Sequence, residues 1–178
     1  ELELNSNEGI TDLIEKRTDV AFRIGVLRDS TLHARPIGHS RIRVVASPEY
    51  LRRHGTPTRV EQLREHDLLG FTQPSSLNEW PLHDADGGPF VIEPAIASSS
   101  GETLRQMAVA GLGIACLSDF LTRQDRRDGR LVQLLARQTQ EVRQPINAVY
   151  YRNTALAARI TCFVDHVTQT LGQRPFDE

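Results

Sequence analysis

The sequence predicts an α/β protein, because strand-like and helix-like stretches alternate along the chain with short connections between them. Its 178 residues suffice for one large domain or for two small lobes. Hydrophobic residues make up 39% and charged residues 25%, an ordinary globular mixture that can bury a core. No apolar run approaches the roughly 20 residues that span a bilayer, so no membrane association is expected.

The first two dozen residues predict a compact strand–helix–strand crossover. Residues 1–4 alternate at period two, residues 10–16 carry the apolar spacing of a short helix, and residues 20–24 indicate a second strand. Such a crossover is typical of a parallel sheet. The chain opens directly in a strand, so we expect its natural start to lie upstream. No signal peptide is visible, which favours a cytoplasmic location.

The next part alternates strands with one well-marked helix. Ser47 is expected to cap this helix, which begins at Pro48 and ends at Gly55. A strong turn signal, residues 86–88 (Asp-Gly-Gly), predicts that the stretches on either side pair as a hairpin. The strands are expected at residues 32–37 and 41–46 around a turn at Gly38, then at 68–71, 80–83 and 90–97, with a helical turn at 58–63.

The last third predicts three helices and three strands. A helix opens in the run 98–102 (Ser-Ser-Ser-Gly-Glu), reaches about residue 110 and ends in a tight turn at 111–113 (Gly-Leu-Gly). Asp119 is expected to cap the second helix, which reaches about residue 126. The last helix follows Thr154 and shows a continuous apolar stripe at Leu156, Ile160, Phe163, Val164, Val167 and Leu171. The strands are expected at 114–117, 131–135 and 146–151.

Charge and reactive residues argue against several kinds of site. The net charge is −2 and the arginines are interleaved with acids, so there is no basic stripe that would bind DNA. The histidines and cysteines show no metal-ligand spacing, so neither metal nor cofactor is expected. Cys116 and Cys162 lie in apolar stretches and are expected to be buried. Cys116 could be a redox switch, but its strand setting favours an inert thiol.

Enzymatic activity is not expected. A hydrolase would need a nucleophile, a base and an orienting group, and no Gly-x-Ser-x-Gly elbow is present. Nothing in the sequence brings a histidine beside Ser99. The Gly-Leu-Gly turn at 111–113 ends a helix and starts a strand, which is the reverse of a dinucleotide-binding loop.

Several segments together resemble the effector-binding domain of LysR-type transcriptional regulators. They occur in the family's order and spacing, at residues 12–25, 46–51 (Ala-Ser-Pro-Glu-Tyr-Leu), 55–57, 66–71, 80, 101–104, 110–120 and 156–171. The chain departs from the family at Ser118, where a proline is usual, and at Ser99 and Ser100, where Asn-Asp is common. The family domain also begins with one more strand and helix before the position of Glu1.

The resemblance implies a fold like the type 2 periplasmic binding proteins: two Rossmann-like lobes joined by two crossover strands. Lobe I would comprise residues 1–46 and 148–178, without its first strand and helix, and lobe II residues 47–147. The chain would be the small-molecule sensor of a regulator that binds DNA through an upstream winged helix-turn-helix and forms a homodimer or homotetramer through this domain. The alternative is a solute-binding protein of a transporter, whose gene would encode a signal peptide; a hydrolase is a weaker alternative.

Ligands of open α/β sheets bind outside the carboxyl ends of the strands. Applied to the expected strands, this rule selects mostly hydroxyl and amide side chains, which suit a small polar effector. They are Asn5, Ser6, Gly25, Ser47, Phe71, Thr72, Gln73, Ser98, Ser99 and Ser100. The helix N-terminus at 98–102, or the missing partner helix, is expected to bind a carboxylate of the effector. The alternative is that Ser99 or Ser100 only caps the helix.

Overall fold

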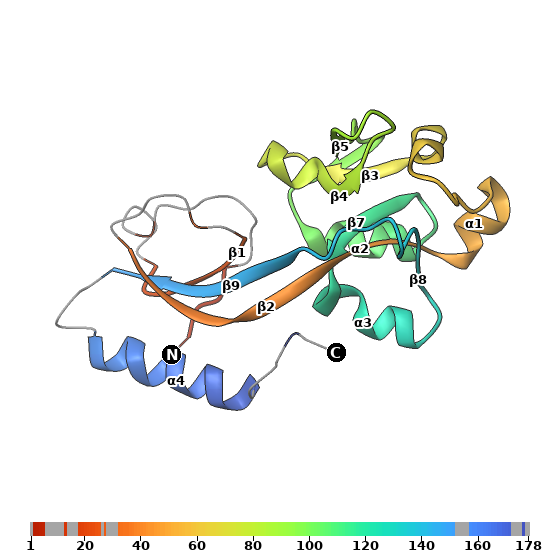
Figure 1. Ribbon diagram of the computed structural model, residues 1–178. Helices are drawn as coiled ribbons and strands as arrows, with labels where there is room; N and C mark the ends of the chain where they lie inside the picture. The colour runs from red at the N-terminus through yellow and green to blue at the C-terminus, as the bar shows by residue number, and fades with distance from the viewer. Residues whose placement is uncertain are drawn as a thin grey trace. The chain divides into compact units, whose positions relative to one another are not determined.

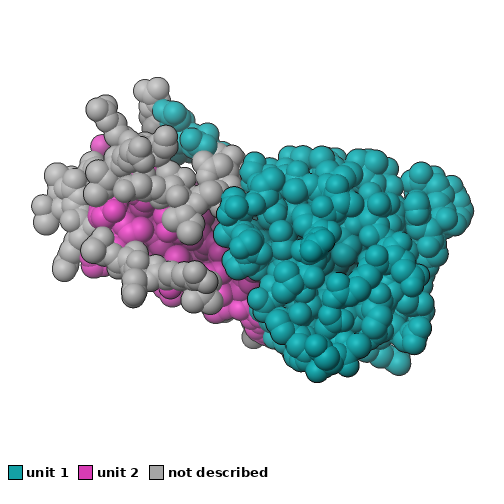
Figure 2. Space-filling model, turned by 90° about the horizontal axis from the view of Figure 1, so that it is seen from above, with its two compact units in different colours: residues 1–9, 42–142 teal, residues 10–41, 143–178 magenta. Residues whose placement is uncertain are grey.

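The computed structural model describes residues 2–5, 13, 18–25, 27, 32–151, 157–171 and 176. The chain divides into two compact units, coloured in Figure 2. Unit 1 comprises residues 1–9 and 42–142, and unit 2 comprises residues 10–41 and 143–178. By this division the chain passes between the units at 9–10, 41–42 and 142–143, and the last two lie a few residues before the crossings expected from the sequence. The two-lobe assignment of residues 1–46, 47–147 and 148–178 stays a prediction.

Unit 2 contains an antiparallel sheet with a helix packed on it (Figure 1). Strand β9 (Arg143–Tyr150) lies between β1 (Ala21–Ile24) and the first part of β2 (His33–Ala46). Helix α4 (Ala157–Leu171) buries Ile160 and Val164, two residues of the expected apolar stripe. Phe163 packs against Phe22 of β1 with ring centroids 6.4 Å apart, so the stripe faces the sheet.

Strand β2 corrects one sequence-based prediction. Two strands around a turn at Gly38 were expected, but residues 33–46 form one continuous strand. β9 pairs with it from His33 opposite Tyr150 to Arg41 opposite Arg143, and the register shifts between Pro36 and Gly38. Pro36 and Gly38 lie at this irregularity in the pairing with β9. A strand tolerates both residue types at such a bulge.

Unit 1 contains a mixed sheet in which β3 (Leu68–Phe71) is central. β3 runs parallel to both β6 (Ile96–Ser98) and β7 (Ile114–Ser118), whereas the second part of β2 runs antiparallel to β7. The short β8 (Val132–Gln133) pairs with the end of β2. The carboxyl ends of the three parallel strands therefore lie at one edge of the sheet, and the end of β2 lies at the opposite edge.

Helices and a hairpin cover this sheet on both faces. On one side lie α1 (Pro48–His54), the 3-10 helix Val60–Glu65 and the hairpin of β4 (Glu79–His83) with β5 (Pro89–Val91); a second 3-10 helix, Ser75–Asn78, precedes β4. On the other side lies α2 (Gly101–Val109), with α3 (Asp119–Arg127) packed beside it (Figure 1). The apolar runs of β3 and β7 follow from this arrangement, because a strand covered on both faces buries nearly all of its residues.

The core alternates at period two along each strand. Val44, Leu68 and Cys116 belong to the cluster under α1 and the hairpin, which also holds Tyr50, Leu63, Trp80 and Phe90. Their neighbours Val45, Leu69 and Leu117 belong to the opposite cluster, with Leu104 and Ala108 of α2. A substitution that truncates one of these core side chains therefore removes contacts from only one of the two clusters.

Most of the other expected helices and strands are confirmed. The strand expected at 90–97 is divided into β5 and β6, because Pro94 lacks an N–H for a continuous ladder. Only Val132 and Gln133 of the strand expected at 131–135 are paired. Residues 2–5 are described and belong to no strand, so the first expected strand is wrong there. The helix expected at 10–16 lies, apart from Leu13, outside the described residues.

Candidate functional site

The carboxyl ends of β3 and β6 bring six of the expected site residues together. Phe71 is in register with Ser98, and the Thr72 N–H donates to the Ser98 carbonyl at 3.1 Å. Thr72, Gln73 and Ser99 are exposed, whereas Phe71, Ser98 and Ser100 are half-buried. The residues following two adjacent parallel strands thus present one aromatic ring beside a group of hydroxyl and amide side chains, at the edge where α/β sheets bind ligands.

The three serines have different local roles. Ser100 caps α2, since its Oγ accepts a hydrogen bond from the Thr103 N–H at 3.4 Å. The Ser98 Oγ accepts from the Ser100 N–H at 3.2 Å, which fixes the turn between β6 and the helix. Ser99 is exposed, and no hydrogen bond of its hydroxyl is found within the described part of the chain. Of the three, Ser99 is therefore the hydroxyl best placed to bind a ligand.

The first turn of α2 also carries a negative charge, which bears on anion binding there. Glu102 forms two hydrogen bonds with Arg105, at 2.7 and 2.8 Å. These bonds are the main reason why the pKa of Glu102 lies below its ordinary value. Arg105 also binds Asp125, which is completely buried in α3. The charge of Glu102 is therefore balanced within the domain, and the helix N-terminus keeps its partial positive charge.

Asn78 holds the loop that follows β3. Its Oδ1 accepts from the Phe71 N–H and its Nδ2 donates to the Phe71 carbonyl, both at 2.8 Å, so the side chain acts as a pairing partner for the end of the strand. The fit requires glycine at position 70, where a Cβ would lie 2.7 Å from the Asn78 Oδ1. The loop between Phe71 and Asn78 contains a cis peptide bond before Pro74. Asn78 was not expected from the sequence, because no local pattern links it to a strand end seven residues earlier.

Ser47 lies at the opposite edge of the sheet from Phe71 and Ser98. The antiparallel register places Ile42 opposite Ser118 and Val45 opposite Ala115, so β2 ends where β7 begins. Ser47 is 2% exposed, and its Oγ accepts from the Tyr50 N–H at 3.2 Å as the cap of α1. The structure does not bring it together with the other site residues, and its local geometry gives it a capping role.

The remaining expected site residues are Gly25, Asn5 and Ser6. Gly25 belongs to unit 2, has a φ of 97°, and donates its N–H to the Pro145 carbonyl at 2.9 Å. The positive φ favours glycine there for backbone reasons alone. Asn5 is exposed and groups with unit 1. Ser6 lies outside the described residues.

A buried ionic cluster lies where β7 ends and α3 begins. Asp119 is 2% exposed and accepts hydrogen bonds from Arg43 Nε and from Arg126, both at 2.7 Å. Arg43 also donates to Gln133 of β8 at 3.2 Å. From the sequence, Asp119 was expected only to cap the helix. The helix cap is Ser118, and it makes no side-chain capping bond. The cluster ties α3 to β2 and β8.

The thiols differ from what the sequence suggested. Cys116 is buried in β7, and burial raises the pKa of its thiol, as expected for an inert cysteine. Cys162 is exposed on α4, so the prediction that it is buried is wrong.

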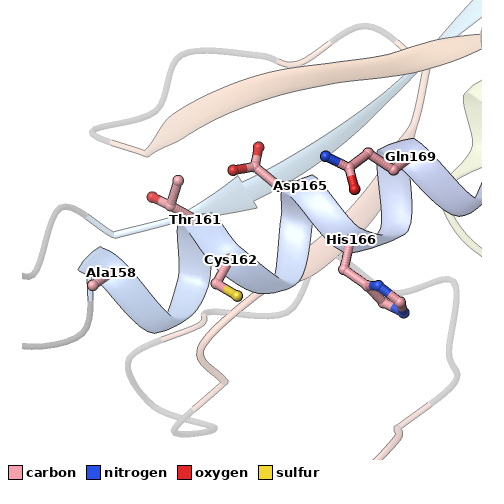
Figure 3. Close-up of a pocket in the computed structure, with 6 residues that line it drawn as sticks. All are labelled: Ala158, Thr161, Cys162, Asp165, His166 and Gln169. Atoms are coloured by element: carbon pink, nitrogen blue, oxygen red, sulfur yellow. The ribbon is translucent and has the colours of Figure 1, made fainter.

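A shallow cavity of about 610 Å³ runs along α4, with Thr161, Asp165 and Gln169 on one side and Cys162 and His166 on another (Figure 3). It contains none of the expected site residues.

Within the described part of the chain, no group of three or more His, Cys, Asp or Glu side chains is placed to hold a metal ion. None of the described helices is long and apolar enough to cross a membrane.

Comparison with known proteins agrees with this arrangement. Residues 1–172 match the family model described as the LysR substrate binding domain. The HTH-type transcriptional regulator CrgA of Neisseria meningitidis is 50% identical over 171 residues, which cover 96% of this chain and 57% of CrgA. An uncharacterized HTH-type transcriptional regulator of Haemophilus influenzae is 32% identical over 161 residues, which cover 90% of this chain and 56% of that regulator. The chain thus spans little more than half the length of the regulators it matches.

Solved structures lead to the same family. The CrgA regulatory domain superposes with a TM-score of 0.85 at 49% identity, over 92% of this chain and 80% of that domain. The full-length virulence activator AphB of Vibrio cholerae, a LysR-type regulator, gives a TM-score of 0.72 at 33% identity, over 90% of this chain and 55% of AphB. These neighbours confirm the type 2 periplasmic-binding-protein-like α/β fold expected from the sequence. The chain belongs to the LysR substrate binding domain family, the regulatory domain of LysR-type transcriptional regulators.

Proposed function

We propose that this domain senses a small carboxylate effector at the carboxyl edge of the unit 1 sheet and thereby controls DNA binding by an upstream winged helix-turn-helix. The observation that carries the proposal is the hydrogen bond from the Thr72 N–H to the Ser98 carbonyl, which joins the residue after β3 to the end of β6, directly before Ser99. Phe71 offers an apolar surface next to these polar groups, the usual composition of a small-molecule site.

The N-terminus of α2 supports a carboxylate in particular. Backbone N–H groups at a helix N-terminus attract anions, and a neighbouring hydroxyl adds a hydrogen-bond donor. Ser100 is already used as the cap, so the proposal assigns the ligand contact to Ser99 and Thr72. Aromatic carboxylates, amino acids and metabolite acids all have the required group.

A thermal-shift screen of such acids tests the proposal, because a ligand that binds only the folded state raises Tm by mass action. We expect Ser99→Ala to weaken the binding of an active acid by about three- to tenfold, the equivalent of one hydrogen bond. Thr56→Ala is the matched control, since Thr56 is also exposed but lies outside this edge. Unchanged affinity in the Ser99 variant, together with a Thr72→Val variant that binds normally, would reject the site.

We further propose that effector binding changes the arrangement of the two units in a homodimer or homotetramer, and so changes the spacing of the DNA-binding heads. Such a regulator would act in the cytoplasm, where it meets its DNA. The relatives support this view, because they are described as helix-turn-helix regulators and extend well beyond this chain. Small-angle scattering of the full-length regulator with and without an active acid tests it. An identical scattering curve under saturating ligand would exclude the switching mechanism.

The alternative of a transporter's solute-binding protein is not favoured, because the matched relatives are transcriptional regulators. We also propose that the domain has no catalytic activity. Turnover of any substrate in a panel of esters and amides would disprove this.

A further inference from the structure

Tyr50 of α1 lies between two histidine rings on unit 1. The tyrosine is 1% exposed. Its ring stacks on His54, one helical turn later, with centroids 4.4 Å apart and an interplanar angle of 12°. The ring of His66, from the segment before β3, approaches at 5.7 Å and 50°. His66 is half-buried and His54 is exposed, so the two imidazoles meet different amounts of solvent.

The Tyr50 hydroxyl links two neighbours in one chain of hydrogen bonds. It accepts from the Asp67 N–H at 2.9 Å and lies 3.3 Å from the His66 Nδ1. A hydroxyl has one proton to donate. When His66 is neutral with an unprotonated Nδ1, that nitrogen accepts this proton and the chain is complete. A doubly protonated imidazole has no acceptor: its Nδ1–H can only donate to the hydroxyl oxygen, so the buried hydroxyl proton loses its partner, which is costly in a buried site.

This chain of bonds connects α1 to the amino ends of the central strands. The Asp67 carbonyl accepts from the Ile114 N–H at 2.9 Å, at the start of β7. Gly113 packs so closely that a Cβ there would lie 2.3 Å from the same oxygen. Arg53 of α1 donates to the Gly111 carbonyl at 3.0 Å. Loss of the Tyr50 contact would therefore weaken a polar connection between α1 and the amino ends of β3 and β7.

Burial and the charged groups around His66 together set the direction in which its pKa is shifted. Burial is the largest effect and lowers the pKa of His66, His54 of α1 lowers it further, and the acids Glu65 and Asp67 of its own segment act in the opposite direction. Arg53 lies on the α1 side near Tyr50. Gly113, directly before β7, and Ile114, the first residue of β7, approach Asp67 and carry no charge. The folded state thus prefers neutral His66, so its contribution is complete above the ordinary value of 6.5 and is lost as the pH falls below it.

We propose that the Tyr50–His66 hydrogen bond is an acid-sensitive latch that holds α1 on the amino edge of the unit 1 sheet and opens when His66 is protonated. The latch lies at the opposite edge of the sheet from the proposed effector site. It gives the domain a response to mild acidification that does not depend on the effector.

Hydrogen exchange of the full chain at pH 7.5 and pH 5.5, corrected for intrinsic rates, tests the latch. We expect protection of the α1 amides, Leu51 and Gly55 among them, to fall several-fold at pH 5.5. The binding of one proton limits this fall to about tenfold for each pH unit. In His66→Gln the side-chain oxygen can accept without titrating, so protection should stay constant. Tyr50→Phe keeps the ring and removes the bond, so its protection should be low at both pH values.

His39→Gln is the matched control, since His39 belongs to unit 2 and takes no part in the latch; this variant should behave like the wild type. Equal α1 protection of the wild-type chain at the two pH values overturns the proposal. So does a His66→Gln variant that remains as pH-sensitive as the wild type, because another group, such as His54, would then be responsible. The wild-type comparison decides the question even if a variant fails to fold.

Discussion

Replacement of Asn78 by alanine should destabilise the domain far more than its place in a short surface helix suggests. Asn78 is 9% exposed, and its amide forms two hydrogen bonds of 2.8 Å with the Phe71 backbone. Each such bond contributes about 1 kcal/mol net, and leaving a half-buried N–H and C=O unsatisfied adds to the loss. We therefore expect the free energy of unfolding to fall by about 2–3 kcal/mol.

Urea unfolding at pH 7 measures this change. Ser76→Ala is the matched control in the same 3-10 helix: Ser76 is exposed, so its replacement should change stability by less than about 0.5 kcal/mol. Asn78→Asp is a sharper test, because the aspartate keeps an acceptor for the Phe71 N–H but places a second oxygen against the Phe71 carbonyl. This variant should be at least as unstable at pH 7 and partly recover in acid, where the protonated carboxyl can donate. A loss below about 0.5 kcal/mol for Asn78→Ala would refute the pairing role.

Three further perturbations have defined outcomes. Gly113→Ala should lower the free energy of unfolding by about 2 kcal/mol or more, because the new Cβ would lie 2.3 Å from the Asp67 carbonyl oxygen and the backbone would have to move. Urea unfolding measures this change, and an unchanged stability would contradict the close approach. Asp119→Asn should lower the free energy of unfolding by about 2–3 kcal/mol in the same assay; this value is reduced because Arg43 and Arg126 are partly exposed. A variant as stable as the wild type would argue against the ionic cluster. Thiol titration of the native chain should show one fast cysteine, Cys162, and Cys116 should react only after unfolding; two fast thiols would contradict the buried setting of Cys116.

Local signals explain what the sequence could predict about the fold. Ser47, Pro48 and Gly55 define the ends of α1 because capping depends on neighbours within one turn of helix. The glycine turn at 111–113 was assigned correctly as structural for the same reason: Gly111 has a φ of 77°. The continuous β2 could not be predicted, because the bulge around Gly38 depends on β9, more than 100 residues later in the chain.

Long-range contacts explain what was missed about the site. The strand-end rule selected Phe71–Gln73 and Ser98–Ser100 correctly as neighbours, since both follow parallel strands of the same sheet. It placed Ser47 in the same group, because the sequence does not reveal that β2 runs antiparallel to β7. Arg43 bonds Asp119 from 76 residues earlier in the chain, and Asn78 bonds Phe71 across the intervening loop; no regular spacing in the sequence indicates either contact.

The most direct test of the effector site is an amide chemical-shift titration of the isotopically labelled chain with a carboxylate that raises its Tm. We predict that the largest shifts fall on Thr72, Gln73 and Ser99, with smaller ones in the first turn of α2. Shifts confined to α4, or spread over residues remote from the ends of β3 and β6, would contradict the assignment of ligand binding to this edge of the sheet.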